Sequence, residues 1–149
     1  MSAPARPPVE AVAAAMWAED RASRGLGMEL LEVGEGRAKL AMRIGEAMVN
    51  GHGIAHGGFI FTLADSAFAF ACNWTGEVTV AAHCQITYLR PARLGQRLVA
   101  EAVETFREGR NGITDVRVRT EEGETIAMFR GHSRTIGGSI LPQAKEERS

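Results

Sequence analysis

The sequence predicts one α+β domain in which a curved antiparallel sheet wraps around a single long apolar helix. The segment 58–73 is apolar on almost every side, and such a helix must be buried on most of its faces. Other segments alternate apolar and polar residues with a period of two, which is typical of half-buried strands. Two of these segments precede the helix and about four follow it. This order favours a sheet of about five to six strands with the helix segregated to one face.

The first part of the chain predicts a tail and a short helix. Residues 1–8 contain three prolines and are expected to form a flexible tail. Apolar positions then follow helical spacing and predict a short N-terminal helix, punctuated at its end by Gly25 and Gly27. These positions are Val9, Val12, Ala13, Met16 and Trp17.

The strands are predicted from alternation and from the turns between them. Segment 37–44 alternates clearly, and segment 28–33 is its expected partner across a turn at 34–36. After the long helix, strands are predicted at 78–88, 98–103, 113–120 and 125–136, with weaker alternation at 98–103. A turn at 121–124 joins the last two into a hairpin. The domain is therefore expected over residues 9–138, and residues 139–149 are expected to form a second flexible tail.

Composition narrows the classes of partner. A chain of 149 residues with a net charge of −1 has no general attraction to nucleic acid or to anionic lipid. No apolar run reaches the ~20 residues needed to cross a bilayer. The N-terminal residues have no apolar core like that of a signal peptide, so a cytoplasmic location is expected. Cys72 and Cys84 have neither metal-ligand spacing nor a redox motif, and buried reduced thiols are expected.

The long helix carries one acid in an apolar setting. Between Gly58 and Cys72 the polar side chains are Thr62, Asp65 and Ser66. They fall on one helical stripe, which could face solvent or line a cleft. A solvent face should also carry Lys, Glu or Arg, so a narrow stripe of small polar groups favours the wall of a cleft.

A glycine-rich turn precedes this helix. The first N–H groups of a helix lack intrahelical partners and lie at the positive end of its dipole. Glycine at 57 and 58 lets a phosphate or a developing oxyanion approach these donors closely. Asn50, His52 and His56 lie just upstream as neutral donors or acceptors, although either histidine could be purely structural.

The local chemistry therefore combines a carbonyl site with a carboxylate. Asp65 lies about two turns beyond the glycines and could act as a base on water or attack directly. Such a pairing suits attack on an acyl carbon. No metal is predicted, because the two histidines lie on a glycine-broken loop with no clear third ligand.

Taken as a set, four motifs resemble the hotdog-fold acyl-CoA thioesterases, and most closely the PaaI-type phenylacetic acid degradation thioesterases. The similarity runs from about residue 17 to residue 138 and includes patterns at 129–131 and 136–138. The motifs are Asn50-Gly-His52, His56-Gly57-Gly58, Leu63-Ala-Asp65 and Tyr88-Leu-Arg-Pro91.

The resemblance implies an acyl-CoA hydrolase without metal or cofactor, built from dimers with shared active sites that pair into a homotetramer. It implies that the Gly57 N–H polarises the thioester carbonyl and that Asp65 is the nucleophile or general base. Asn50 and His56 would position the carbonyl or the water. Some relatives add a Ser or Thr on the facing strand, where this sequence has Ala81 and Ala82. That role is missing here or belongs to Thr62 or Ser66.

Substrate contacts are also expected. His52, Gly58, Thr62 and Ser66 are assigned to substrate binding. CoA needs cations for its phosphates, and Arg110 with Asn111 on a glycine-flanked turn is favoured for them. Three further arginines are candidates, although each could equally lie on a solvated face: Arg90, Arg93 and Arg134.

The acyl group and the reaction leave alternatives open. The family implies (hydroxy)phenylacetyl-CoA, while an apolar lining would also accept related aryl or medium-chain acyl-CoAs; the expected lining is Phe59, Phe61, Phe68 and Trp74. One alternative is a hotdog acyl-thioester dehydratase or hydratase that pairs His56 with Asp65. Another is a non-enzymatic acyl-CoA-binding protein, although 149 residues leave little room for an output domain.

Overall fold

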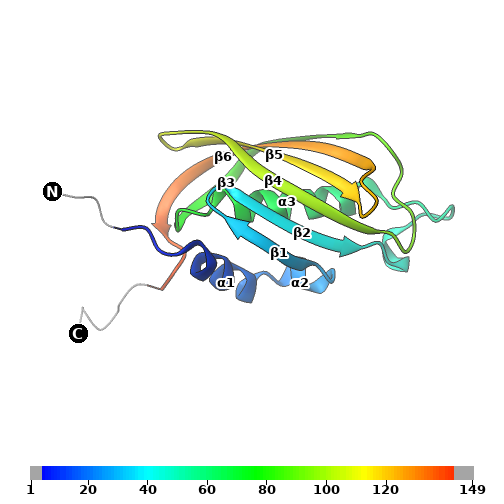
Figure 1. The fold of residues 1–149 in the computed structure, drawn as a ribbon, viewed down its shortest axis with the longest axis horizontal. Coiled ribbons are helices and arrows are strands. Elements are labelled where there is room, and N and C mark those ends of the chain that lie inside the picture. The colour runs from blue at the N-terminus through cyan, green and yellow to red at the C-terminus, as the bar shows by residue number, and fades with distance from the viewer. Residues whose placement is uncertain (1–4, 143–149) are drawn as a thin grey trace.

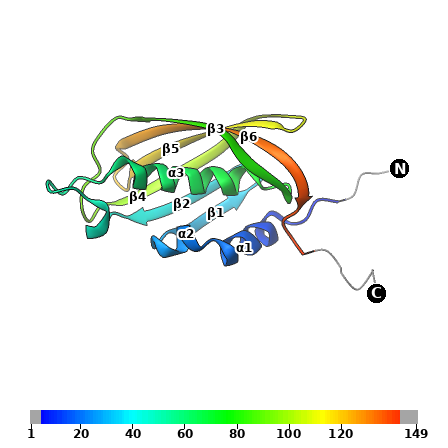
Figure 2. The same cartoon turned by 180° about the vertical axis from the view of Figure 1, so that it is seen from behind.

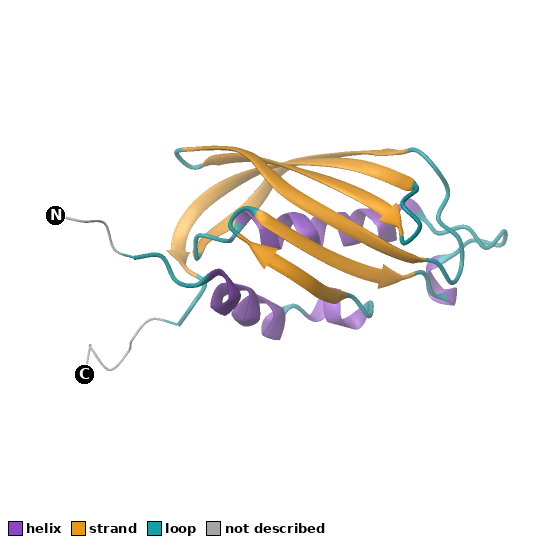
Figure 3. Ribbon diagram, viewed as in Figure 1, coloured by secondary structure: helices purple, strands orange, loops and turns teal. Residues whose placement is uncertain are grey.

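A computed structural model describes residues 5–142 and confirms the predicted α+β arrangement (Figures 1 and 3). Six strands form one antiparallel sheet in the order β1-β2-β4-β5-β6-β3. The helices are α1 (Val9–Glu19), α2 (Arg21–Gly25) and α3 (Gly57–Cys72), with a 3-10 turn at Glu46–Met48. The strands are β1 (Glu29–Gly34), β2 (Arg37–Arg43), β3 (Glu77–Tyr88), β4 (Arg97–Glu108), β5 (Asn111–Thr120) and β6 (Thr125–Ser139). The expected tails fall largely on residues 1–4 and 143–149, which lie outside the described residues.

The sheet curves around α3, which runs along its inner face (Figure 2). Burial of this helix on most sides follows from its composition, because it holds no Lys, Arg or Glu and its one acid is Asp65. Alanines along α3 let it approach the strands closely. The core is formed by fully buried side chains of α3 and of the central strands: Leu63, Phe68, Leu40, Met42, Leu98, Val116 and Val118.

Gly131 of β6 lets α3 pack against the sheet. A Cβ at this position would lie 2.6 Å from the ring of Phe68, which is itself buried. The ring therefore occupies the space that a side chain at 131 would need. This contact gives a structural reason for the glycine in the 129–131 pattern.

The N-terminal segment forms two helices where the sequence predicted one. The break falls at Asp20, whose carboxylate accepts a hydrogen bond of 2.9 Å from the Ser23 N–H and so caps α2. Gly25 is the last residue of α2. The sequence predicted it at the end of a single N-terminal helix. Both helices lie beside β1, at the edge of the sheet opposite β3 (Figure 2).

Strand β4 extends five residues beyond the predicted segment, to Glu108. Two of the charged residues in this extension, Glu104 and Arg107, are paired. Glu104 accepts hydrogen bonds from the Trp74 indole (2.9 Å) and from Arg107 (2.9 Å). Arg107 also donates to the Cys72 carbonyl at 2.7 Å, where a cation is favourable at the C-terminus of α3.

Strand β3 is an edge strand, paired with β6 on one side only. A register shift between Ala81 and His83 switches which residues face inward. Both cysteines are free thiols: Cys72, at the end of α3, is buried as predicted, whereas Cys84, on the open-edged β3, is only half-buried.

None of the helices formed by residues 5–142 is both long and apolar enough to cross a membrane.

Candidate active site

The loop before α3 is held together by Asn50. Its side-chain oxygen accepts hydrogen bonds from the N–H groups of His52 (2.9 Å) and Ile54 (3.1 Å). Its own N–H donates to the Ile54 carbonyl at 2.9 Å. Within residues 5–142 the Asn50 amide nitrogen has no partner, so this donor stays available at the exposed side of the loop. Asn50 thus both shapes the loop and offers a donor beside the start of α3.

The first turn of α3 presents free backbone donors. His56 occupies the N-cap position, and its side chain makes no capping hydrogen bond. The N–H groups of Gly57 and Gly58 have no acceptor among the described residues. They also lie at the positive end of the helix dipole. Two donors are therefore available for a carbonyl oxygen or an oxyanion.

Tyr88 covers Gly57 from β3. The Tyr88 hydroxyl donates a hydrogen bond of 2.8 Å to the Gly57 carbonyl, and a Cβ at 57 would lie 2.7 Å from the ring. Burial raises the pKa of the Tyr88 phenol, so it stays protonated as a donor at neutral pH. Both residues line a cavity of about 420 Å³, which also includes Ile54, Ile60 and Arg90.

Asp65 lies half-buried in a second cavity, of about 210 Å³, with Phe68, Ala69, Cys72 and Thr79. Burial raises the pKa of the Asp65 carboxyl above its ordinary value, and the charge of Asp20 raises it further. A carboxylate with a raised pKa is a stronger base, which suits activation of water.

The stripe on α3 comprises positions 62, 65, 66, 69 and 73, and its polar side chains have different roles. Thr62 donates its hydroxyl to the Gly58 carbonyl at 2.8 Å. Ser66 is buried against Ser23, and Asn73 is buried in two hydrogen bonds with the Thr79 backbone. Within the described chain, only Asp65 and Ala69 of this stripe line the cavity around Asp65. The burial of Ser66 and Asn73 argues against a solvent-facing stripe.

Gly57 and Asp65 do not meet within one chain. They lie eight positions apart on α3, which is ~12 Å along the helix axis. Their two cavities share no lining residue. Each cavity borders an opposite end of β3, the Gly57 cavity at Tyr88 and the Asp65 cavity at Thr79.

The candidate phosphate-binding arginines also lie at opposite ends. Arg110 stands on the turn between β4 and β5, and its carbonyl accepts from the Thr135 N–H at 2.8 Å. Because Thr135 pairs with Thr79, Arg110 belongs to the Asp65 end of the molecule. Asn111 accepts from Arg134 at 3.5 Å and lies 3.1 Å from the His132 ring. Arg90, by contrast, borders the Gly57 cavity and donates to the Thr125 carbonyl at 2.8 Å.

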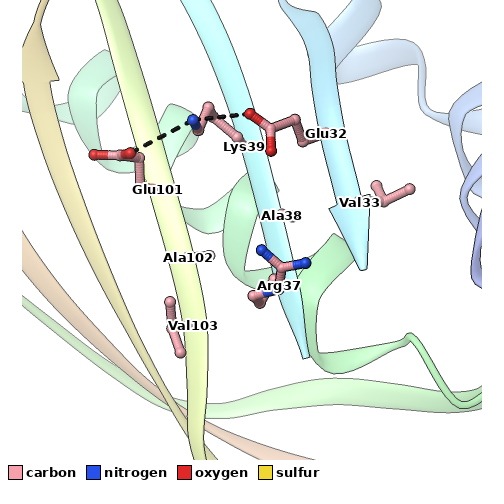
Figure 4. A pocket seen from close by; sticks show the side chains of 8 residues that line it. All are labelled: Glu32, Val33, Arg37, Ala38, Lys39, Glu101, Ala102 and Val103. Atoms are coloured by element: carbon pink, nitrogen blue, oxygen red, sulfur yellow. Dashed lines mark ion pairs between the residues drawn. The ribbon is translucent and has the colours of Figure 1, made fainter. Parts of the chain in front are cut away.

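A hollow of about 170 Å³ on the sheet holds none of the candidate residues (Figure 4). Lys39 reaches Glu32 at 2.8 Å and Glu101 at 3.7 Å across it. Lys39 and the two glutamates are thus paired with one another, whereas Arg37, which also lines the hollow, has no ion-pair partner among the described residues.

The described residues contain no group of three or more His, Cys, Asp or Glu side chains that could hold a metal ion. The roles of His52 and His56 stay predictions, and both side chains are exposed on the loop before α3.

Known families provide the next comparison. The family model of the Thioesterase superfamily matches residues 52–127, a range that includes the glycine turn, the whole of α3 and β3. The chain belongs to the thioesterase superfamily.

Individual thioesterases agree with this assignment. The chain is 39% identical over 130 residues to the acyl-coenzyme A thioesterase PaaI of Escherichia coli (strain K12), which covers 87% of this chain and 93% of the relative. It is 31% identical over 112 residues to acyl-coenzyme A thioesterase 13 of Homo sapiens, covering 72% of this chain and 79% of that protein. The solved structure of the E. coli PaaI protein matches with a TM-score of 0.86 at 38% identity and covers 88% of this chain and 95% of that one. The predicted hotdog fold and the resemblance to PaaI-type thioesterases are thereby confirmed.

Sequence reasoning missed two residues near Asp65. Asp20 affects the pKa of Asp65, and Ser23 joins Asp20 to Ser66. The signal was present as Asp20-Arg-Ala-Ser23, an Asp at an N-cap with a hydroxyl three residues later. Nothing in the sequence indicated that this cap would lie against α3.

Proposed function

We propose that this thioesterase hydrolyses (hydroxy)phenylacetyl-CoA or related aryl or medium-chain acyl-CoAs to the free acid and CoA, at a site shared between two chains. Acyl-CoA thioester hydrolysis as such follows from membership of the superfamily and from the close similarity to PaaI over most of the chain. The observation that carries the shared site is the separation of Gly57 and Asp65 into two cavities at opposite ends of β3.

Each chain of the dimer supplies a different part of one active site. The N–H of Gly57 in one chain polarises the thioester carbonyl, and Gly58 leaves room for it. Asp65 of the second chain activates water as a general base or attacks the carbonyl as a nucleophile. The free amide of Asn50 and the imidazole of His56, both beside Gly57, position the carbonyl or the water.

The open edge of β3 offers a way to join the halves. Antiparallel pairing of β3 with the β3 of a second copy would place the Tyr88 end of one strand against the Thr79 end of the other. The Gly57 cavity of one chain would then face the Asp65 cavity of the other, twice in each dimer. Such pairing also removes two exposed strand edges and covers side chains of β3 such as Val80, which is 42% exposed in the single chain. Two dimers then form the homotetramer.

The same dimer brings candidate CoA-binding side chains from both chains to one substrate. Arg110 and Asn111 come from the chain that supplies Asp65, and Arg90 comes from the chain that supplies Gly57. A CoA molecule crossing between the chains would meet both. Arg110 remains the first candidate for the phosphates, and among the described residues its side chain, like that of Arg93, has no hydrogen-bond or ion-pair partner.

The acyl group is expected on an apolar surface. Phe68 lines the Asp65 cavity, and Ile54, Ile60 and Leu89 line the Gly57 cavity. Two of the other aromatic residues expected to line the pocket pack elsewhere. Phe61 packs edge-on against Phe129 at 5.3 Å, and Trp74 is held by Glu104. These apolar walls favour a tolerant acyl specificity.

We also propose a cytoplasmic location, which the two free thiols Cys72 and Cys84 support. Neither nucleic acid nor a membrane is expected as a partner, since the net charge is −1.

A hydrolysis screen tests the proposal. Aryl, short and medium acyl-CoAs would be incubated with the protein with and without EDTA, and free thiol would be measured. Thiol release that is strongest with aryl or medium-chain esters and unaffected by EDTA supports the proposal, whereas loss of activity in EDTA would contradict a metal-free mechanism. Parallel assays with enoyl-CoA address the dehydratase alternative, since hydration without thiol release would point to it. Binding of acyl-CoA without any turnover would point to the non-enzymatic alternative.

A further inference from the structure

A buried chain of hydrogen bonds connects α2 to the helix that carries Asp65. Asp20 accepts from the Ser23 N–H at 2.9 Å and from the Ser23 hydroxyl at 2.7 Å. The Ser23 hydroxyl lies 2.7 Å from that of Ser66 on α3. Ser23 is 1% exposed and Ser66 8% exposed, so water does not compete for these bonds.

The carboxylate of Asp20 sets the direction of this chain. An ionised carboxylate only accepts hydrogen bonds, so the Ser23 hydroxyl must donate to it. The single proton of Ser23 is then used, and the Ser66 hydroxyl must donate to the Ser23 oxygen. Every hydroxyl in the chain therefore points away from α3 and toward the charge on Asp20.

Capping of α2 does not explain the whole arrangement. The cap needs only the Ser23 N–H and the Asp20 carboxylate. Ser66 lies in the interior of α3, where alanine is a better helix former and fills four nearby positions: Ala64, Ala67, Ala69 and Ala71. A serine there gains its buried partner only from α2. The Ser66 hydroxyl thus serves the contact between the two helices, one residue after Asp65.

The negative charge of Asp20, at one end of this series of hydrogen bonds, also affects the pKa of Asp65. Burial comes first and the Asp20 charge second among the causes that raise the pKa of Asp65. The other ionisable groups that interact with Asp65 are thiols, Cys72 on α3 and Cys84 on β3. Burial raises the pKa of Cys72 to about 12 and also raises that of Cys84, so both thiols are neutral at neutral pH. In the shared site, His56 of the second chain would be a further neighbour.

We propose that Asp20 is a positioning residue for Asp65, which pins α2 to the catalytic helix through Ser23 and Ser66 and keeps a fixed negative charge close to the reacting carboxylate. This inference rests on the catalytic role proposed for Asp65. A nearby negative charge makes Asp65 a stronger base. The hydroxyl chain fixes the helix segment that carries it.

The variant Asp20→Asn separates charge from structure. The Asn oxygen still accepts from the Ser23 N–H, while its amide donates to the Ser23 oxygen and Ser23 donates in turn to Ser66. All three hydrogen bonds are kept, but the charge is gone and the chain runs in the opposite direction. Because the raised pKa of Asp65 then falls, the acid limb of the pH profile of kcat/KM should move to lower pH. At neutral pH kcat should fall about 3- to 10-fold, with KM nearly unchanged, since only part of the base's contribution is lost.

Glu19→Gln is the matched control. Glu19 is an exposed carboxylate one residue before Asp20, and within residues 5–142 it makes no side-chain hydrogen bond or ion pair. The Glu19→Gln change removes one negative charge that takes no part in the hydrogen bonds between Asp20, Ser23 and Ser66. Its pH profile should match that of the unmodified protein. An equal shift in both variants, or no shift in Asp20→Asn, would overturn the proposal.

Ser66→Ala provides a second readout, and it should fold because alanine suits this helix. It leaves the cap of α2 and the charge intact but removes the link, so kcat should fall while KM and the acid limb change little. Unchanged kcat in this variant would also overturn the proposal.

Asp65→Asn distinguishes failure of the positioning role of Asp20 from failure of the catalytic role of Asp65. If Asp65→Asn is inactive while Asp20→Asn and Ser66→Ala behave like the unmodified protein, the catalytic role of Asp65 stands and only the positioning role fails.

Discussion

Tyr88 and Gly57 are joined by a hydrogen bond of 2.8 Å from the phenol to the glycine carbonyl, and the ring occupies the space where a side chain at 57 would stand. The contact explains why a side chain at this position would force the Tyr88 ring to move. It also places a polar aromatic side chain at the rim of the cavity in which the thioester carbonyl is expected to bind.

Gly57→Ala should therefore damage both packing and catalysis. The added methyl would lie 2.7 Å from the Tyr88 ring, which must move and lose its bond to the carbonyl. Because this ring is 47% exposed and has room to shift, the free energy of unfolding should fall by only ~1 kcal/mol, the low end for overpacking. Turnover should fall more, by about tenfold or greater, because the displaced ring crowds the carbonyl site. Thermal unfolding and thiol release measure the two effects.

Gly58→Ala is the comparison for stability. No atom lies within 4 Å of the added methyl, and alanine is the better helix former, so unfolding stability should not decrease. A loss of stability equal to that of Gly57→Ala would contradict the role assigned to Tyr88.

Asp65→Asn should make the protein more stable at neutral pH. The pKa of Asp65 is raised in the folded chain above its ordinary value of 3.8, so the fold favours the protonated form. The stability that this group contributes is complete below pH 3.8 and is lost as the pH rises through the raised pKa. Asparagine does not ionise and avoids that loss. Chemical denaturation at several pH values should show a gain for the variant at pH ~7 that shrinks toward zero near the ordinary carboxyl pKa.

Glu101→Gln should change stability at neutral pH in the direction opposite to Asp65→Asn. Burial raises the pKa of Glu101, but the hydrogen bond from Arg119 and the charges of Arg119, Lys39 and Arg117 outweigh it and hold the pKa below its ordinary value. Removing this carboxylate should lower stability at neutral pH. If both variants changed stability in the same direction, the environment inferred for Asp65 would be wrong.

Gly131→Ala should destabilise the fold by displacing Phe68, which also lines the Asp65 cavity. The methyl would lie 2.6 Å from the buried Phe68 ring, which must move to admit it. A loss of ~1–3 kcal/mol in unfolding free energy is expected. Adding Phe68→Leu should recover part of this loss, because the smaller side chain leaves room for the methyl. If the two changes are simply additive in denaturant titrations, the packing explanation fails.

Much of this fold was open to prediction because its signals are local. The period-two alternation of β3, the turn of the β5–β6 hairpin and the apolar surface of α3 each lie within one segment. The break between α1 and α2 was missed although its signal is local: Asp20 caps α2 through the Ser23 N–H, three residues later. The full length of β4 was missed for a different reason. Glu104 and Arg107 look like loop residues until Trp74 and the end of α3 supply their partners.

The candidate site was predictable in its residues but less so in its arrangement. Gly57 and Asp65 stand out in the sequence by residue type and context. Their placement in separate cavities depends on the position of β3, whose ends border one cavity each. The role of Ser66 depends on α2, a contact that no spacing in the sequence encodes.

Arg110→Ala should weaken binding of CoA esters selectively. Loss of one phosphate-binding cation should raise KM for an acyl-CoA about tenfold with little change in kcat, and the effect should shrink in high salt. The same acyl group on N-acetylcysteamine, a thiol without phosphates, is the control substrate, and its KM should not change. An equal rise in KM for both substrates would assign Arg110 a structural role.

The shared site is tested most directly by complementation between two impaired chains, each with one lesion. One chain carries Asp65→Asn and the other carries Gly57→Ala, and the two are mixed under conditions in which subunit exchange is proven by a mass or affinity tag. In a dimer with shared sites, a mixed pair combines both lesions in one site and leaves the other site with an intact Gly57 and an intact Asp65. We predict that each mixed dimer recovers one competent site in two, so thiol release per mixed dimer should be about half that of the unmodified dimer, and an equal mixture after random exchange, in which about half of the dimers are mixed, should reach about a quarter. No recovery despite proven exchange would place Gly57 and Asp65 of each site in a single chain and would contradict the shared arrangement.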